Sequence, residues 1–151
     1  DSAYAQRAAR VSELTKDLSE LLPDLVPKLL ARLGNAARPR LALHPPCTLQ
    51  HGQQIKGVIE KHLTQLGFDV ALPASEAHLC CGSAGTYSVL NPELSYQLRD
   101  RKLGVLNEAF GEQPPDMILS ANIGCITHLQ SGTGTPVRHW VEVLDEALRQ
   151  R

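Results

Sequence analysis

Four cysteines lie in loop-like stretches of the 151-residue chain and carry most of its chemical information: Cys47, the adjacent Cys80 and Cys81, and Cys125. Each stands close to a proline, a glycine or a residue that starts a helix. A cysteine that serves only as a small core hydrophobe is expected inside an apolar strand or helix face instead. Because soft thiolates select zinc, copper(I) or iron-sulfur clusters, this placement predicts that the four thiols are metal ligands.

The spacing of the cysteines favours a multi-iron centre over a single zinc ion. A zinc site usually contains paired C-x-x-C steps. The chain has none, and its comparable step is Cys125-x-x-His128, whose side chains would share one helix face. Neighbouring Cys80 and Cys81 can face one centre only where the backbone turns, and Gly82 permits that turn. A cluster accepts adjacent thiolates at different iron atoms, whereas one ion closed by chain neighbours is geometrically awkward.

Three other uses of the thiols stay open at this point. The cysteines could form two disulfides or be unrelated buried thiols, although disulfide scaffolds are usually shorter and denser in cysteine. A structural zinc module that serves only assembly is the second alternative. A cysteine hydrolase is the third, because Cys47 or Cys125 with a nearby histidine would make a nucleophile and a base, but this use leaves the Cys80-Cys81 pair unexplained.

Several histidines lie near the cysteines in sequence. His128 either binds metal or lies on a helix face with a hydrogen bond to the backbone. His44, His51 and His78 flank the cysteines, where they would tune thiol basicity or donate to cluster sulfurs, unless they are ordinary loop histidines.

A helical arm over residues 1–35 is expected to precede the cysteine-rich part. Apolar residues recur there at three- and four-residue steps among charged ones. Pro23 and Pro27 are expected to divide this run into a long helix and a short one, and Gly34-Asn35 predicts its end. We therefore expect a second domain, rich in cysteine, over residues 36–151.

Residues 36–151 alternate short apolar runs with amphipathic segments, which is typical of β-α-β units. The expected strands are 41–43, 68–72, 117–119 and a short one at Val137. The expected helices are 52–66 closed by Gly67, one from Asn91-Pro92 to Gly111, one capped by Asn122, and 140–148. The sequence thus predicts an α/β fold, a Rossmann-like three-layer domain with a small, mainly parallel sheet of about four strands. The cysteines follow the first three strands, so all four are expected at the carboxyl edge of the sheet, where such folds bind ligands.

Charge and hydropathy argue against two classes of partner. Lys plus Arg (15) nearly balances Asp plus Glu (16), so we expect no nucleic-acid partner. No run approaches the roughly 18 apolar residues that span a bilayer, so we expect no membrane insertion. The cysteine usage predicts a reducing, cytosolic setting. The chain begins at Asp1 and not at methionine, which suggests one piece of a longer polypeptide.

A cysteine, a 32-residue gap, Cys80-Cys81-Gly82-Ser-Ala-Gly, and a distant Asn-Ile-Gly-Cys125-Ile-Thr-His128 together resemble the cysteine-rich CCG domain. This family occurs in subunits of heterodisulfide reductase and of anaerobic glycerol-3-phosphate dehydrogenase, in lactate-utilisation proteins and in the glycolate oxidase iron-sulfur subunit. The resemblance runs from about Arg40 to the carboxyl end. The segments around Cys47 and Cys125 look most like the carboxyl-terminal CCG domain of glycolate oxidase iron-sulfur subunits.

The resemblance implies an electron-transfer part with no substrate turnover of its own. It would take electrons from FAD-containing subunits that oxidise a 2-hydroxy acid such as glycolate, and pass them toward a membrane acceptor. Its other partner would be the rest of its own iron-sulfur subunit. The implied location is cytoplasmic, with the complex associated peripherally with the inner membrane.

The resemblance also implies an iron-sulfur cluster of the 4Fe-4S type at Cys47, Cys80, Cys81 and Cys125, with Gly82 beside it. The fifth cysteine of the family pattern is His128 in this chain. The five-cysteine noncubane cluster is therefore in doubt, and a four-thiolate centre, with or without the imidazole, takes its place. We expect an isolated, aerobically handled domain to lose the cluster or to bind zinc instead.

Overall fold

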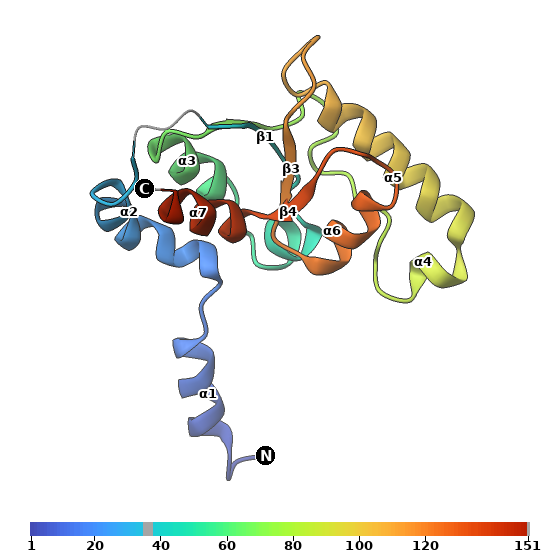
Figure 1. Cartoon of the computed structure of the whole chain (residues 1–151). Helices are drawn as coiled ribbons and strands as arrows, with labels where there is room; N and C mark the ends of the chain where they lie inside the picture. Colours follow the sequence, from blue (N-terminus) through green and yellow to red (C-terminus); the bar gives the residue numbers. More distant parts are fainter. Residues whose placement is uncertain (35–37, 151) are drawn as a thin grey trace.

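The computed structural model describes residues 1–34 and 38–150, and its centre is a four-stranded sheet (Figure 1). The strands lie in the order β2-β1-β3-β4, and every neighbouring pair is parallel. Their bounds are β1 Arg40–Leu43, β2 Asp69–Ala71, β3 Met117–Ser120 and β4 Val137–His139. The predicted α/β fold with a small parallel sheet is confirmed, and each strand lies where an apolar run predicted one.

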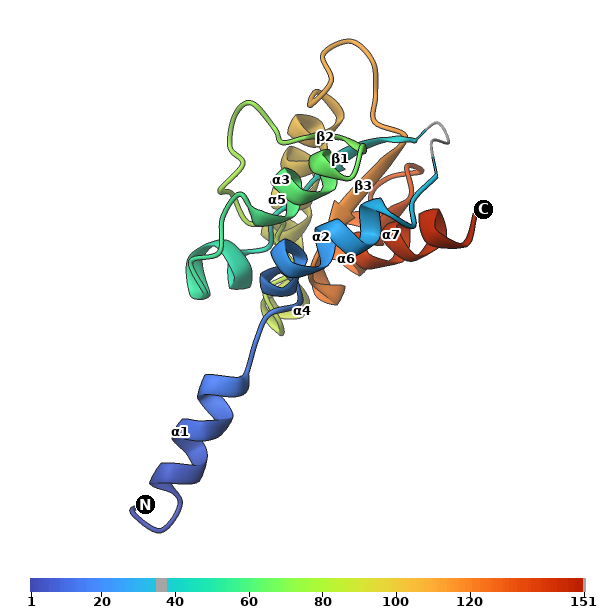
Figure 2. The ribbon, with the colours of Figure 1, turned by 90° about the vertical axis from the view of Figure 1, so that its left-hand side faces the viewer.

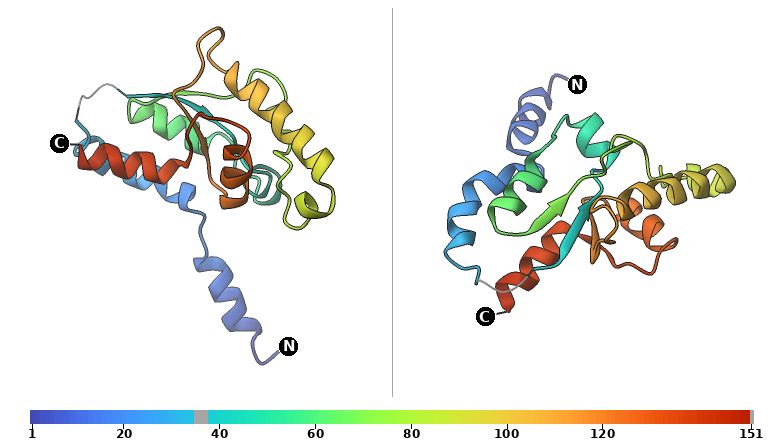
Figure 3. Two further views of the ribbon diagram at one scale, coloured as in Figure 1. Left: turned by 45° about the vertical axis from the view of Figure 1, so that its right-hand side comes forward. Right: turned by 90° about the horizontal axis from the view of Figure 1, so that it is seen from above.

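Helices cover both faces of the sheet, which gives the predicted three layers (Figure 3). Alternate residues of a strand point to opposite faces, so Leu41 and Leu43 pack into one apolar core and Ala42 into the other. The first core contains side chains from α2, α3 and α7, and the second contains side chains from α5 and α6. The helix bounds are α2 Leu22–Leu30, α3 Val58–Gln65, α4 Tyr87–Leu90, α5 Pro92–Asn107, α6 Ile123–Gln130 and α7 Trp140–Arg149.

The two central strands, β1 and β3, send the chain away from their carboxyl ends in opposite directions. From β1 the chain runs through α3 to β2 at one edge, and from β3 it runs through α6 to β4 at the other edge. α3 packs in the first core and α6 in the second, so these two crossovers cover opposite faces. Such a divergence creates the crevice in which open α/β sheets bind ligands.

The amino-terminal arm breaks at a different place from the one predicted. α1 (Ala5–Leu14) extends away from the sheet and buries none of its residues (Figure 2). The break falls at Asp17, whose carboxylate caps the 3-10 turn η1 (Leu18–Leu21). The predicted break at Pro23 and Pro27 is wrong. Pro23 lies in the first turn of α2, where no backbone N–H is needed, and Pro27 lies inside the same helix.

α2 packs on the sheet and is not part of the extended arm. Its side chains Leu22 and Val26 are buried in the first core, against α3 and α7. The helix ends at Leu30, before the predicted stop at Gly34-Asn35, and Asn35 lies outside the described residues. The division of the chain at residues 35 and 36 stays a prediction.

Two helices differ from prediction at one end. The helix predicted over 52–66 begins only at Val58, because Gly57 has a φ of +77°, in the left-handed region, and the residues before it form the π-type turn η2 (Thr48–Gly52). Its predicted end is confirmed, since Gly67 follows it with a φ of +85°.

α5 begins at Pro92 as predicted, but the side chain of Asn91 makes no capping hydrogen bond. The helix ends at Asn107, before the predicted stop at Gly111. Within residues 1–34 and 38–150, no helix combines the length and the apolar character needed to cross a lipid bilayer.

Candidate metal centre

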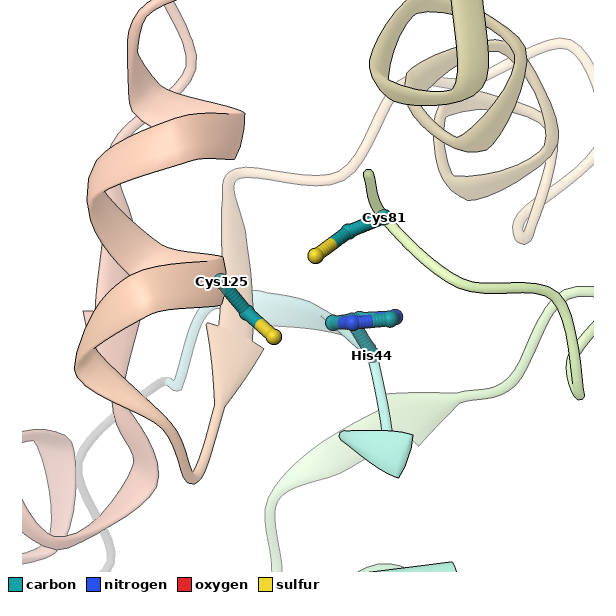
Figure 4. Close-up of side chains that lie close together, drawn as sticks. All are labelled: His44, Cys81 and Cys125. Atoms are coloured by element: carbon teal, nitrogen blue, oxygen red, sulfur yellow. The ribbon is translucent and has the colours of Figure 1, made fainter. Parts of the chain in front are cut away.

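Three side chains meet beyond the carboxyl ends of the central strands (Figure 4): His44, Cys81 and Cys125. One donor atom from each lies within 4.8 Å of the other two. All three residues are buried, with the His44 side chain fully enclosed and Cys81 1% exposed. The structure therefore places a nitrogen donor and two sulfur donors in the crevice between β1 and β3.

The ends of β1 and β3 position two of these donors. His44 directly follows β1. Its backbone N–H donates to the backbone carbonyl of Leu119 at 2.8 Å, which continues the pairing with β3. Cys125 lies in the first turn of α6, where the carboxamide oxygen of Asn122 accepts from the N–H groups of Gly124 (2.9 Å) and Cys125 (3.3 Å). The predicted cap at Asn122 is thus confirmed, and it fixes the orientation of the turn that carries Cys125.

Gly82 fixes the third donor by holding its loop against α5. Its φ is +93°, and a Cβ at this position would lie 2.4 Å from the carbonyl oxygen of Ser95. The hydroxyl of Ser95 also donates to the carbonyl of Gly82 at 2.9 Å. Only glycine fits this close approach, so the turn expected after the Cys80-Cys81 pair is present.

The adjacent residues Cys80 and Cys81 have different neighbours. Cys81 lies with Cys125 and His44, whereas the half-buried Cys80 interacts with Cys47. Burial, and then the neighbouring Cys80, raise the pKa of Cys47 to about 11. Cys47 follows β1, the Cys80-Cys81 pair follows β2 and Cys125 follows β3, so all four thiols lie at the carboxyl edge of the parallel sheet, where they were predicted. All four are free thiols, which removes the disulfide alternative.

The two buried thiols shift each other's pKa in opposite directions. A hydrogen bond with Cys125 lowers the pKa of Cys81 against the opposing effect of burial, and contacts with His44 and Ser83 lower it further. The same hydrogen bond and burial raise the pKa of Cys125. The hydroxyl of Ser83 lies between the two sulfurs, 3.3 Å from Cys81 Sγ and 3.9 Å from Cys125 Sγ. The lowered pKa of Cys81 favours its thiolate, the form that binds metals.

Lys102 of α5 places a buried cation beside the thiols. Its side chain is only 1% exposed, and its ammonium group donates to the carbonyls of Glu76 (2.5 Å) and Ala77 (3.3 Å), in the loop that leads to Cys80. Burial lowers the pKa of Lys102, while interactions with three of the thiols, that of Cys47 foremost, oppose this shift. No sequence pattern indicates this contact, because Lys102 lies in a helix of mixed polarity.

His128 lies near the centre but has other partners. Its Nε2 is 3.2 Å from the carbonyl oxygen of Ser95 and 3.1 Å from the Ser95 hydroxyl, and its ring stacks on Tyr96. The sequence offered two alternatives for His128, a metal ligand or a histidine hydrogen-bonded to the backbone, and the structure shows the second arrangement. His51 and His78 are exposed, and Nε2 of His51 lies 3.2 Å from the carbonyl oxygen of His78.

The sequence placed His44 among residues that could tune the thiols and did not single it out. Its position directly after an apolar strand was the one usable signal, since ligands of parallel sheets gather there. The signal was weak, because three other histidines also lie close to the cysteines in sequence.

Residues 41–130 match the family model described as the cysteine-rich domain CCG. The chain belongs to this family. The matched segment contains all four cysteines, His44 and His128, so the CCG match spans the site described above. The predicted recognition is confirmed.

Individual CCG relatives carry names from hydroxy-acid metabolism. The chain is 47% identical over 150 residues to the glycolate oxidase iron-sulfur subunit of Escherichia coli (strain K12), which covers 99% of this chain and 35% of the relative. It is 29% identical over 154 residues to lactate utilization protein A of Geobacillus kaustophilus (strain HTA426), covering 96% of this chain and 60% of the relative. The Bacillus subtilis (strain 168) protein of that name is 25% identical over 153 residues, covering 96% and 60%. The chain thus spans only part of each relative.

Proposed function

We propose that this CCG domain is the iron-sulfur electron-transfer part of a flavin-linked 2-hydroxy-acid oxidase of the glycolate type. The observation that carries the proposal is the gathering of four thiols at the crevice between β1 and β3, with Cys81 and Cys125 buried there beside His44. The name of the 47% identical relative, a glycolate oxidase iron-sulfur subunit, supports the same assignment. In this proposal Cys47, Cys80, Cys81 and Cys125 hold a centre of the 4Fe-4S type.

The residues present fit such a centre. Soft sulfur donors suit iron-sulfur chemistry, and the two ring nitrogens of His44 are buried without a hydrogen-bond partner among the described residues, which leaves donor capacity inside the site. A bound cluster would supply one-electron transfer. The chain itself shields the inner side of the site from water through Cys81 and Cys125, while half-buried Cys47 and Cys80 reach the outer side, where a redox partner could approach.

The partners in this proposal are FAD-containing subunits and the rest of the same iron-sulfur subunit. The chain covers 35% of the glycolate oxidase relative, which is consistent with a domain that works inside a longer polypeptide. We place the complex in the cytoplasm, peripherally on the inner membrane, and we keep residues 1–35 as the helical connection to the rest of the subunit.

Iron and acid-labile sulfide analysis after strictly anaerobic purification tests the proposal. We expect about four iron and four sulfide per chain, as a 4Fe-4S centre requires, and an electron paramagnetic resonance signal on reduction. The reduced flavin-containing partner should bleach the visible absorption of the oxidised centre. Stoichiometric zinc without sulfide in anaerobic protein would contradict the proposal.

A structural zinc site is the second candidate, and one observation favours it. The donors of His44, Cys81 and Cys125 lie within 4.8 Å of one another. Bonds of about 2.3 Å to sulfur and about 2.0–2.1 Å to nitrogen would let one tetrahedral ion bind all three after a small adjustment. The same metal analysis distinguishes the two candidates. A cysteine hydrolase is disfavoured, because Cys125 and His44 are both buried and the pKa of Cys125 is raised.

Replacing Lys102 by methionine should lower the reduction potential of the centre. A buried positive charge stabilises the more negative, reduced state, and its removal favours the oxidised one. Loss of the ammonium also leaves the carbonyls of Glu76 and Ala77 without their donor, at a cost of about 1–3 kcal/mol in the free energy of unfolding. Potentiometric titration followed by visible absorption measures the shift.

Arg101→Met provides the matched control for Lys102→Met. Arg101 is the neighbouring cation on α5, but it is exposed and pairs with the carboxylate of Glu76 at the surface. We expect this variant to leave the potential close to that of the wild type. Equal shifts in both variants would show that Lys102 has no special role.

A further inference from the structure

We propose that His44 is a metal ligand, so that the buried half of the centre is a His-Cys-Cys donor set formed with Cys81 and Cys125. This inference rests on the proposed function because it requires a metal centre at the cysteines. It holds whether that centre is an iron-sulfur cluster or a single ion. The sequence suggested only that His44 tunes the thiols or donates to cluster sulfurs, not that it binds metal.

The first observation is that His44 is fully buried with both ring nitrogens unpartnered. Neither Nδ1 nor Nε2 makes a hydrogen bond of ordinary geometry among the described residues, and the polar group that the ring contacts is the thiol of Cys81. Buried polar side-chain atoms in proteins nearly always have a partner, and an exception calls for an explanation such as a missing ion. A ring nitrogen that binds metal would no longer lack a partner.

The second observation is the direction of the neighbouring sulfurs. Figure 4 shows the sulfurs of Cys81 and Cys125, which come from different segments, both pointing toward the space next to the imidazole of His44. The donor atoms of the three residues lie within 4.8 Å of one another, which is close enough for a shared metal ion or cluster edge. Three separate segments supply these donors, namely the end of β1, the loop after β2 and the first turn of α6, so the site forms only when these segments fold together.

The third observation is Ser120, which lies beside His44 on the adjacent strand. Leu43 pairs with Leu119 in the register of β1 and β3, so the next positions are His44 and Ser120. The hydroxyl of Ser120 is buried and also has no partner in the part of the chain that the structure describes. Histidines that bind metal through one nitrogen usually donate the other N–H to a nearby oxygen. The Ser120 hydroxyl is the neighbouring oxygen on β3, although it makes no hydrogen bond with His44 in this structure.

His128 differs from His44 because its ring has hydrogen-bond partners. It also lies close to the cysteine loop, but its Nε2 is occupied by Ser95 and its ring stacks on Tyr96. Two histidines thus flank the site, and of these two His44 is the one whose ring nitrogens are both free for a metal within residues 1–34 and 38–150. His128→Ala is therefore the matched control for His44→Ala.

Pulsed electron paramagnetic resonance on anaerobically prepared, reduced protein tests the proposal. Protein labelled with ¹⁵N-histidine should show the strong nitrogen coupling of a directly bound imidazole. We expect His44→Ala to lose this coupling and His128→Ala to keep it. His44→Cys, which restores a ligand of the thiolate type, should recover the metal content and have a lower reduction potential, because replacement of thiolate by imidazole raises the potential of such centres.

Absence of strong nitrogen coupling in the wild-type centre, or its persistence in His44→Ala, would overturn the proposal. If His44→Ala fails to fold, as judged by circular dichroism, His44→Cys takes its place, and loss of the coupling in that variant gives the same support. If anaerobic protein contains no iron-sulfur centre, the proposed function fails, and cobalt(II) titration of the metal-free protein tests the ligand role separately. A fall in cobalt affinity of more than about 100-fold for His44→Ala, and clearly larger than that for His128→Ala, would support it, because outer-shell changes cost about 10–100-fold; a smaller fall would overturn it.

Discussion

Replacing Cys81 by serine is expected to abolish the metal centre while leaving the fold in place. Cys81 is the thiol that connects the two halves of the site, because it lies with His44 and Cys125 and is the chain neighbour of Cys80. A serine hydroxyl has nearly the same size but does not ionise at neutral pH and is a poor ligand for soft metals. Since the loss of an outer-shell contact already costs about 10–100-fold in metal affinity, we expect a larger loss here.

Metal content per chain and far-ultraviolet circular dichroism measure the two halves of this prediction. Cys81 is itself a member of the second core, but large aliphatic side chains fill most of both cores and serine is nearly the same size, so the free energy of unfolding of the metal-free protein should fall by only about 1–2 kcal/mol. Ser83→Ala is the matched control, because it removes a hydroxyl that lies 3.3 Å from Cys81 Sγ but leaves the thiol in place. Iron loading at the wild-type level in Cys81→Ser would refute the assignment.

Replacing Gly82 by alanine is expected to damage both the site and the stability of the fold. A left-handed backbone costs an alanine about 1–2 kcal/mol, and at a φ of +93° the strain is not relieved by a small adjustment. The new Cβ would also lie 2.4 Å from the Ser95 carbonyl and 3.1 Å from the Cβ of Leu98, so the loop must move away from α5. We expect a loss of about 2–4 kcal/mol in the free energy of unfolding, together with weaker metal binding as Cys81 is displaced.

Gly85→Ala separates the two causes of this effect. Gly85 lies in the same loop with a φ of +58°, but a Cβ there would meet no atom within 4 Å among the described residues. Urea unfolding should therefore show a loss of only about 1–2 kcal/mol, from the backbone alone, and metal binding should stay close to that of the wild type. Equal losses in the two variants would mean that the contact with α5 does not matter.

The positions of the strands and the edge of the sheet at which the thiols lie were predictable because they follow from local signals. Apolar runs placed all four strands, and the requirement that crossovers connect parallel strands placed each cysteine at the carboxyl edge of the sheet. The cap at Asn122 and the turns at Gly67 and Gly82 were also predictable, because each depends on the intrinsic preference of one residue.

The errors arose where neighbours in space overrule local preference. Pro23 was expected to end a helix, yet it starts α2, since Asp17 caps the turn before it and Leu22 packs into the core. The helix expected from residue 52 begins at Val58, because a π-type turn occupies the residues after Cys47. A helical pattern in sequence cannot show where such a turn interrupts it.

The sequence by itself determined the elements on which the proposed chemistry rests: four cysteines as candidate donors, a glycine at which the chain turns after two of them, and a parallel sheet that brings them to one edge. The tertiary structure decided which donors are enclosed. His44 and Lys102 are common residue types with no distinctive spacing. His44 lies beside Cys81 and Cys125, which come from segments distant in sequence. Lys102 is likewise held by the distant loop that contains Glu76. Burial depends on the packing of the whole chain, so local sequence cannot specify which polar side chains lose contact with water.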